Sequence, residues 1–268
     1  MSRPWTEIHQ AKKAEQFSRI PSEWRLSSEF LTTHKDTVDL RPLAASSGIL
    51  TERELEITDR KYDATALAGQ IASGTYSATE VVTAFCKRTA IAQQLCNCLT
   101  EIMFLDAIEA AKKLDEEYKK TGKTVGPLHG IPMTFKVRNS VKMRWGEKYM
   151  YCEQDKQVLI NIQECFNVKG YDSSDGYISR TFDPSTYDTP LIQIVREAGA
   201  VVISKTNTPQ TMLVAEAHNN VFGQTKNPIV SHLTPGGSSG GEGSVLAFGG
   251  SALGIGTDVG GMFDTFHG

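Results

Sequence analysis

Apolar residues recur at helical spacing through the first half of the chain and predict several helices. A short helix over residues 67–71 ends at Gly74, and the capping box Ser77-Ala-Thr-Glu80 begins a second, longer helix. The apolar stripe of this second helix contains Val81, Val82, Phe85, Ile91 and Leu95. A third helix is expected over residues 107–119. The apolar face of each helix predicts that all three pack on a sheet.

The second half of the chain alternates between strand-like and helix-like segments. Strands are expected over residues 131–136, 200–204 and 252–256, and helices over residues 191–198, 209–216 and 243–248. Such alternation is typical of an α/β fold, in which the loops at the strand ends carry the chemistry.

Residues 1–62 are mixed and polar, and we interpret them as a peripheral helical segment. Trp5 and Trp24 are the expected anchors of its short helices on the body of the protein. Residues 63–268 are expected to form one domain.

Composition excludes several classes of protein. With 268 residues, of which 40% are hydrophobic, the chain is long enough to bury a core. Its formal net charge is −3 and it has no basic block, so we expect no nucleic-acid partner. No apolar stretch approaches the roughly 18 residues of a membrane span, and the N-terminus lacks the apolar region of a secretion signal. The five cysteines are odd in number and lack common zinc or redox spacing, which indicates a reduced, cytoplasmic protein.

Two glycine-rich turns are the strongest functional signal. The run Thr234-Pro-Gly-Gly-Ser-Ser-Gly-Gly-Glu-Gly243 is followed by Gly254-Ile-Gly-Thr-Asp-Val-Gly-Gly261. Three further blocks come before them in the chain, over residues 126–136, 205–210 and 219–228. In this order the blocks resemble the amidase signature family.

The resemblance runs from about residue 63 to residue 261 and implies an α/β fold with a mixed β-sheet core that helices cover on both faces. Residues 83–92 and 97–102 resemble the N-terminal helices of the acetamidase-like branch. The family's sheet continues beyond the second glycine-rich turn, so the sheet of this chain is expected to be incomplete at the C-terminus.

The resemblance assigns catalytic roles to three positions. Lys136 corresponds to the family's base, Ser238 to a serine in a cis peptide that relays the proton, and position 262 to the nucleophilic serine. Met262 occupies that last position, so the chain lacks the atom that would form an acyl-enzyme. Lys136 must be neutral to act as a base, and the apolar strand before it offers the burial that this requires.

The resemblance also implies groups that bind the oxyanion and the substrate. These are Ser239, Val259, Gly260 and Gly261, where backbone N–H groups of the second turn would point at the developing oxyanion. Neither a metal nor another cofactor is implied. His129 and His218 could suggest a serine–histidine triad, but the lysine relay favours structural or substrate-lining roles for both.

The implied function is hydrolysis of a small carboxylic acid amide to acid and ammonia. A small-molecule amide is the expected partner, and a homodimer is a possible assembly. With Met262 in place of the nucleophile, the chain is expected to be inactive. Two alternatives stay open: an amidotransferase A-type subunit that receives ammonia from a glutaminase partner, and a non-catalytic binding pseudoenzyme.

Residues 137–163 are an atypical insertion that interrupts the family pattern directly after Lys136. The codons of Val137-Arg138 can read GTAAGG and that of Gln163 can read CAG, which are the start and end signals of an intron. The codons of Gly261-Met-Phe263 can also contain a sequence similar to a splice donor, which is the start signal of an intron. We therefore favour a retained intron and a second unspliced donor over a genuine surface insertion with a divergent end.

This interpretation makes a prediction about the transcript. We expect most mature transcripts to join codon 136 to codon 164 and to continue past codon 261 into a serine codon. Amplifying and sequencing the transcript across both junctions measures this. A product that keeps codons 137–163 in most molecules would show a genuine insertion instead.

Overall fold

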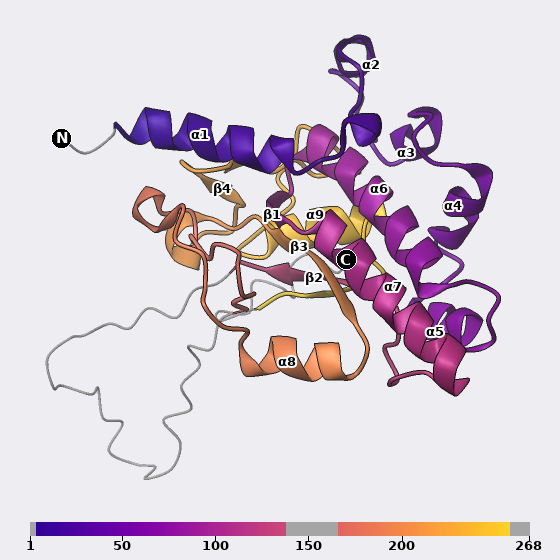
Figure 1. Cartoon of the computed structure of the whole chain (residues 1–268). Coiled ribbons are helices and arrows are strands. Elements are labelled where there is room, and N and C mark those ends of the chain that lie inside the picture. The colour runs from indigo at the N-terminus through magenta and orange to yellow at the C-terminus, as the bar shows by residue number, and fades with distance from the viewer. Residues whose placement is uncertain (1–3, 138–165, 258–268) are drawn as a thin grey trace, which may run out of the picture.

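Four strands form the central sheet of the computed structural model, which describes residues 4–137 and 166–257 (Figure 1). They are β1 (Leu99–Ile102), β2 (Pro132–Lys136), β3 (Val201–Thr206) and β6 (Leu253–Ile255), in the order β1-β3-β2-β6. Strand β2 runs parallel to both β3 and β6, whereas β1 runs antiparallel to β3. The sheet is therefore mixed, and the predicted α/β class is confirmed.

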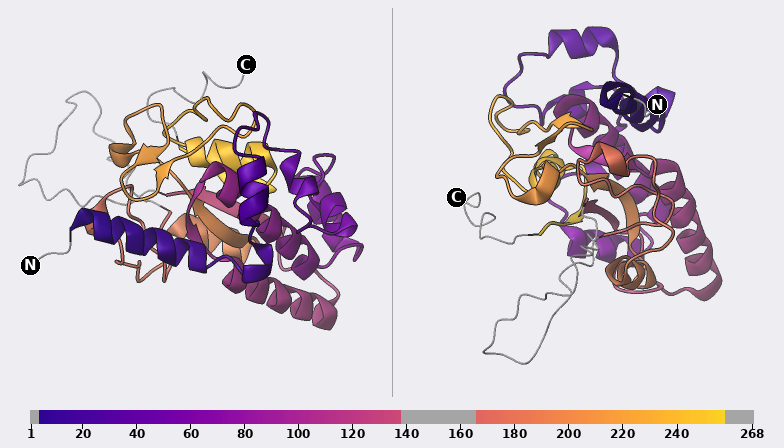
Figure 2. Two further views of the ribbon diagram at one scale, coloured as in Figure 1. Left: turned by 90° about the horizontal axis from the view of Figure 1, so that it is seen from above. Right: turned by 90° about the vertical axis from the view of Figure 1, so that its left-hand side faces the viewer.

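Helices surround this sheet. The α-helices are α1 (Trp5–Ser18), α2 (Ser28–Thr33), α3 (Leu43–Ser46), α4 (Glu52–Ile57), α5 (Ala64–Ala72), α6 (Ala78–Cys96), α7 (Phe104–Thr121), α8 (Pro190–Glu197) and α9 (Gly240–Phe248). The remaining described elements are the 3-10 helices η1 (Ser22–Trp24), η2 (Ile178–Arg180) and η3 (Gln210–Met212), and the strands β4 (His218–Asn219) and β5 (Gly223–Gln224). Helices α6 and α7 lie side by side, and α1 packs against β1, with the N-terminus at the left of Figure 1 (Figures 1 and 2).

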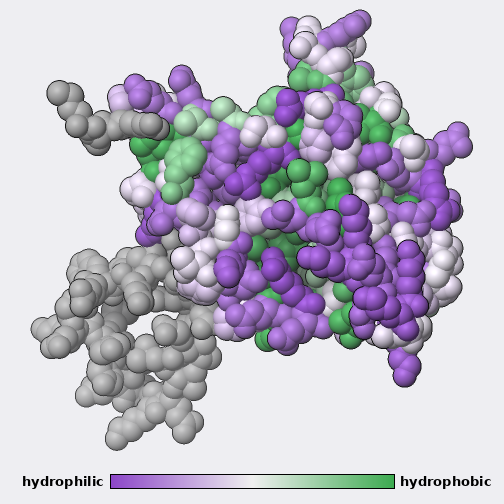
Figure 3. All heavy atoms as spheres, viewed as in Figure 1, coloured by the Kyte–Doolittle hydropathy of each residue, from purple (hydrophilic) through white to green (hydrophobic). Residues whose placement is uncertain are grey.

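Side chains alternate along β2 and place different helices on its two faces. Met133 and Phe135 belong to a hydrophobic core that includes residues of α8. Thr134 and Lys136 instead bond to residues of α9 and of the loop before it. Hydrophilic side chains cover the outer face of α7 (Figure 3). None of the described helices is long and apolar enough to cross a membrane.

Most predicted elements are present with small shifts of their ends, and the capping box of α6 is confirmed. The Ser77 hydroxyl accepts from the Glu80 amide at 3.1 Å, and the Glu80 carboxylate accepts from the Ser77 amide at 2.9 Å. The prediction of a helix over residues 97–102 is wrong, because most of this segment forms β1. Asn97 ends α6 in the left-handed conformation, with φ of 53°, and turns the chain into the strand.

The predicted helix over residues 209–216 is also wrong. The three-residue turn η3 is the only helical element described there, and two of its residues, Thr211 and Met212, have φ of 70° and 56°. Two consecutive residues in the left-handed region cannot continue a right-handed helix.

The N-terminal segment is helical as predicted, but Trp5 is not one of its anchors. Trp5 is 57% exposed, whereas Trp24 is 6% exposed and its ring lies 5.9 Å from the ring of Phe104 in α7. Leu43 joins the same hydrophobic core. The boundary between this segment and the following domain, at residue 62, stays a prediction.

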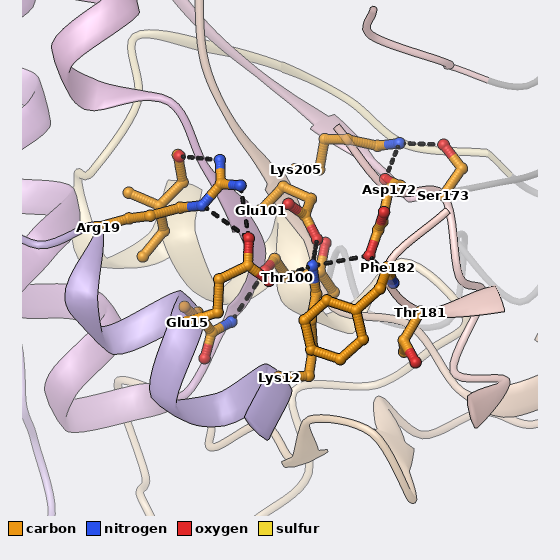
Figure 4. Close-up of polar contacts among 12 residues, drawn as sticks. Lys12, Glu15, Arg19, Thr100, Glu101, Asp172, Ser173, Thr181, Phe182 and Lys205 are labelled. Atoms are coloured by element: carbon orange, nitrogen blue, oxygen red, sulfur yellow. Dashed lines mark hydrogen bonds and ion pairs between the residues drawn. The ribbon is translucent and has the colours of Figure 1, made fainter. Parts of the chain in front are cut away.

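A buried lysine also connects α1 to the sheet (Figure 4). Lys12 is 2% exposed, and its Nζ lies 2.8 Å from Glu101 Oε1 of β1 and 2.7 Å from Asp172 Oδ2. Glu15 of α1 adds a third carboxylate at 2.8 Å. Burial alone would lower the pKa of Lys12, but the three carboxylates outweigh it and raise that pKa. Lys205 of β3 extends the network, because its Nζ donates to the Asp172 carbonyl at 2.8 Å.

We expect Lys12→Met to lower the free energy of unfolding by about 3 to 5 kcal/mol, because it leaves the carboxylates of Glu101 and Asp172 buried without their cation. Urea denaturation measures this change. Lys35→Met is the matched control, since Lys35 is 70% exposed and its removal should change stability by less than about 0.5 kcal/mol. A loss for Lys12→Met as small as that of the control would contradict the prediction.

Candidate active site

Lys136 lies at the carboxyl end of β2 and is fully buried. Its Nζ lies 2.6 Å from Ser238 Oγ, 2.8 Å from Thr257 Oγ1 and 3.0 Å from the Thr257 carbonyl oxygen. Ser238 and Thr257 are only half-buried, so solvent reaches this end of the strand. The structure thus brings together the lysine and the serine that the sequence identified as candidates, and adds a threonine.

Ser238 and Ser239 lie in the glycine-rich loop that leads into α9, and the peptide bond between Gly237 and Ser238 is cis. The first turn of α9 packs tightly on the loop after β3, because the Gly241 amide donates to the Asn207 carbonyl at 3.0 Å. A Cβ at Gly241 would collide with the backbone of Asn207, so glycine is required there. Close packing of this kind holds the serines against the end of the sheet.

Ser239 connects the same loop to the segment after β6. Its hydroxyl donates to the Thr257 carbonyl at 2.9 Å and accepts from the Thr257 amide at 3.1 Å. Ser239 is 5% exposed. In the described residues this hydroxyl therefore holds Thr257 beside Lys136, and its predicted role in binding an oxyanion or substrate stays a proposal.

Thr257 is a site residue that the sequence reasoning did not select. The signal that could have identified it is topological, because Thr257 follows β6, and β6 runs parallel to β2. The carboxyl ends of neighbouring parallel strands lie at the same edge of a sheet.

Glu242, in the first turn of α9, is the second residue that the sequence reasoning missed. It is 1% exposed, and its carboxyl group accepts a hydrogen bond from Thr134 Oγ1 of β2 and one at 2.8 Å from Thr206 Oγ1 of β3. Burial raises the pKa of Glu242 to about 7, although both hydroxyls and the charge of Lys136 act in the opposite direction. A carboxyl group in this environment titrates near neutral pH.

The two histidines come from different parts of the fold. His129 precedes β2, at the end of the strand opposite Lys136, and its Nδ1 accepts from the Val125 amide at 3.0 Å. Burial lowers the pKa of His129. His218 is exposed on β4. The structural or substrate-lining role that the sequence favoured for both histidines stays a prediction.

The other predicted site positions lie outside the described residues. They are Val259, Gly260, Gly261 and Met262, and the same holds for residues 138–163 of the proposed insertion. Within residues 4–137 and 166–257, no group of three or more His, Cys, Asp or Glu side chains could hold a metal ion.

The raised pKa of Glu242 predicts a pH dependence of stability. The folded chain keeps this proton up to about pH 7, whereas the unfolded chain releases it near the ordinary value of 4.5. The stability that protonated Glu242 contributes is therefore complete below pH 4.5 and is lost as the pH rises through 7. Relative to Glu242→Gln, the unsubstituted chain should lose about 3 kcal/mol across this range.

Urea denaturation at a series of pH values measures this difference. The control is Glu197→Gln, which removes an exposed carboxyl group of α8 and should give a stability curve parallel to that of the unsubstituted chain. A parallel curve for Glu242→Gln would show that the buried carboxyl group does not titrate in this range.

Several known proteins resemble this chain in sequence and in fold. A family model described as Amidase matches residues 80–145 and 156–262. A Curvularia clavata protein whose name places it among the amidases is 41% identical over 257 residues, which are 96% of this chain and 42% of that protein. An acetamidase of Emericella nidulans is 38% identical over 261 residues, which are 97% of this chain and 41% of the relative.

The solved structures show the same fold. A fatty acid amide hydrolase superposes with a TM-score of 0.80 at 31% identity, over 97% of this chain and 41% of that structure. The chain thus spans less than half the length of the proteins that it matches. From the family model and the agreement of the fold, the chain belongs to the amidase family.

Proposed function

We propose that the chain carries the base and the relay serine of an amidase that hydrolyses a carboxylic acid amide to acid and ammonia. The observation that carries the proposal is the 2.6 Å contact between Lys136 Nζ and Ser238 Oγ at the end of a buried strand. Membership of the amidase family and the likeness to an acetamidase support a small amide as the substrate. The proposed setting is the cytoplasm.

The proposed reaction begins with a neutral Lys136. Its amine lone pair accepts the Ser238 proton while Ser238 accepts the proton of the nucleophilic hydroxyl, which attacks the amide carbonyl. Thr257, with two oxygen atoms in reach of Nζ, holds the amine in line with Ser238. The proton then returns through Ser238 to the leaving nitrogen, and water hydrolyses the ester to the acid.

The nucleophile is the part of this reaction that the chain does not supply. We propose that position 262 is the nucleophile's position and that Met262 cannot form the ester. Loss of a serine nucleophile lowers kcat by about a million-fold in serine hydrolases. The chain is therefore proposed to be inactive in hydrolysis.

A second candidate function follows from Met262. A protein that keeps the lysine and both serines but lacks the nucleophile could still bind an amide without cleaving it. An amidotransferase A-type subunit is the other alternative from the sequence, and the acetamidase relative favours an amidase over it.

The chain should show no turnover of acetamide or propionamide, and Met262→Ser alone should not restore it. A coupled enzymatic assay of the released ammonia measures this turnover. Turnover of either amide by Met262→Ser would contradict the prediction of inactivity. If adding Lys136→Ala then abolished this turnover, the result would support the proposed roles of position 262 and of Lys136.

A chimera tests the relay directly. It joins residues 1–136 and 164–261 of this chain, without the proposed insertion, to the part of the Emericella nidulans acetamidase that aligns from position 262 onward. We expect the chimera to hydrolyse acetamide, and Lys136→Ala or Ser238→Ala to lower kcat by at least about a hundred-fold. Lys113→Ala in α7 is the matched control and should leave kcat unchanged. A folded chimera in which Lys136→Ala keeps full activity would remove Lys136 from the mechanism.

A further inference from the structure

We propose that Glu242 is a positioning residue for Lys136, whose buried carboxyl group sets the pH at which Lys136 gives up its proton. This inference rests on the proposed function only in giving Lys136 the role of a base. The coupling itself is a property of two buried groups and can be measured in a chain that hydrolyses nothing.

The sheet places Glu242 and Lys136 on the same side of β2. Thr134 and Lys136 are two residues apart on one strand, so their side chains point to the same face. Thr206 is the register partner of Lys136 on β3. Because Thr134 and Thr206 both donate to the Glu242 carboxyl group, this group lies near the base of the lysine side chain, on the face of the sheet that α9 covers.

The fold leaves room for this carboxyl group at one specific position. Gly254 of β6 is the register partner of Thr134, and a Cβ at Gly254 would collide with Glu242 Oε1. The glycine therefore allows the carboxyl group to lie between α9 and the sheet. Helix α9 and the strands β2, β3 and β6 thus enclose the Glu242 carboxyl group behind the candidate base.

The titratable groups that face α9 differ in how they affect Glu242. Among the described residues of the elements packed against α9, these groups include Lys136 on β2, Cys98 before β1, and Cys96 and Arg88 on α6. Lys205 of β3 alternates with Thr206 along the strand and therefore points to the opposite face of the sheet. Lys205 bonds to the loop at Asp172, and Arg88 bonds to the Phe248 carbonyl at the far end of α9. Burial raises the pKa of Cys98, so this thiol stays neutral. Lys136 is the cation whose charge acts on Glu242.

The charge of each group therefore changes the pKa of the other. A negative Glu242 stabilises the ammonium form of Lys136, and a neutral Glu242 removes this stabilisation and favours the neutral amine. Proton loss from one group makes proton loss from the other harder, so the pair titrates in two shared steps. Glu242 acts through Lys136 and needs no contact with substrate.

The test is a titration of the Lys136 Nζ resonance by NMR in the chain labelled with ¹⁵N-lysine, with Lys136→Met used to assign the signal. We expect Glu242→Gln to lower the Lys136 midpoint by about 1 pH unit or more, because it removes a neighbouring negative charge. Glu101→Gln is the matched control. It removes an equally buried carboxyl group that pairs with Lys12, and the Lys136 midpoint should not move.

A second measurement keeps the proposal falsifiable if Glu242→Gln does not fold. Coupling between two sites is reciprocal, so Lys136→Met must raise the midpoint of the Glu242 carboxyl group, followed by ¹³C NMR, by a matching amount. The midpoint of the Glu242 carboxyl group should not change in the Lys12→Met variant.

An unchanged Lys136 midpoint in folded Glu242→Gln, or an unchanged Glu242 midpoint in Lys136→Met, would overturn the inference. A coupled titration together with an inactive acetamidase chimera would count against the proposed function alone. Uncoupled titrations together with an active chimera would count against the inference alone.

Discussion

The burial of the Lys136 amine is the constraint on which the candidate site depends. Removing an amine from water is costly unless polar atoms replace the water. Here the oxygens of Ser238 and Thr257 do so, and they come from two segments other than β2. Because all of these oxygens must reach one nitrogen, the serine loop and the segment after β6 are fixed relative to β2. The tight packing of Gly241 on Asn207 serves the same geometry.

A comparison of Lys12 and Lys136 shows how the same side chain serves two purposes in one fold. Three carboxylates surround Lys12 and raise its pKa, so it remains a cation that joins α1 to the sheet. The hydrogen-bond partners found for Lys136 are hydroxyl and carbonyl oxygens, which can accompany a neutral amine as well as an ammonium group. The environment of Lys12 suits a permanent ion pair, whereas Lys136 is proposed to exchange a proton with Ser238.

The sequence was sufficient to predict the α/β class, the strand that ends in Lys136 and the helix that follows the serine loop. Local signals carry these predictions, because strand periodicity and a capping box are short-range patterns. The failures are of two kinds. Asn97 and Thr211 adopt left-handed conformations that no periodicity reveals, so the helices predicted near them are absent. Thr257 reaches the site because β6 pairs with β2, and Glu242 reaches it because α9 packs on the sheet. Both contacts join residues more than 100 positions apart, and such contacts cannot be read from a single sequence.

The central claim is that the Lys136 amine is buried and held by Ser238 and Thr257, and its reactivity toward an acylating reagent tests this most directly. Trace acetylation of the folded chain, followed by mass spectrometry of lysine-containing peptides, compares Lys136 with Lys35, which is 70% exposed. The account predicts strong protection of Lys136 that disappears when the chain is unfolded in urea. Acetylation of Lys136 in the folded chain as fast as that of Lys35 would contradict it.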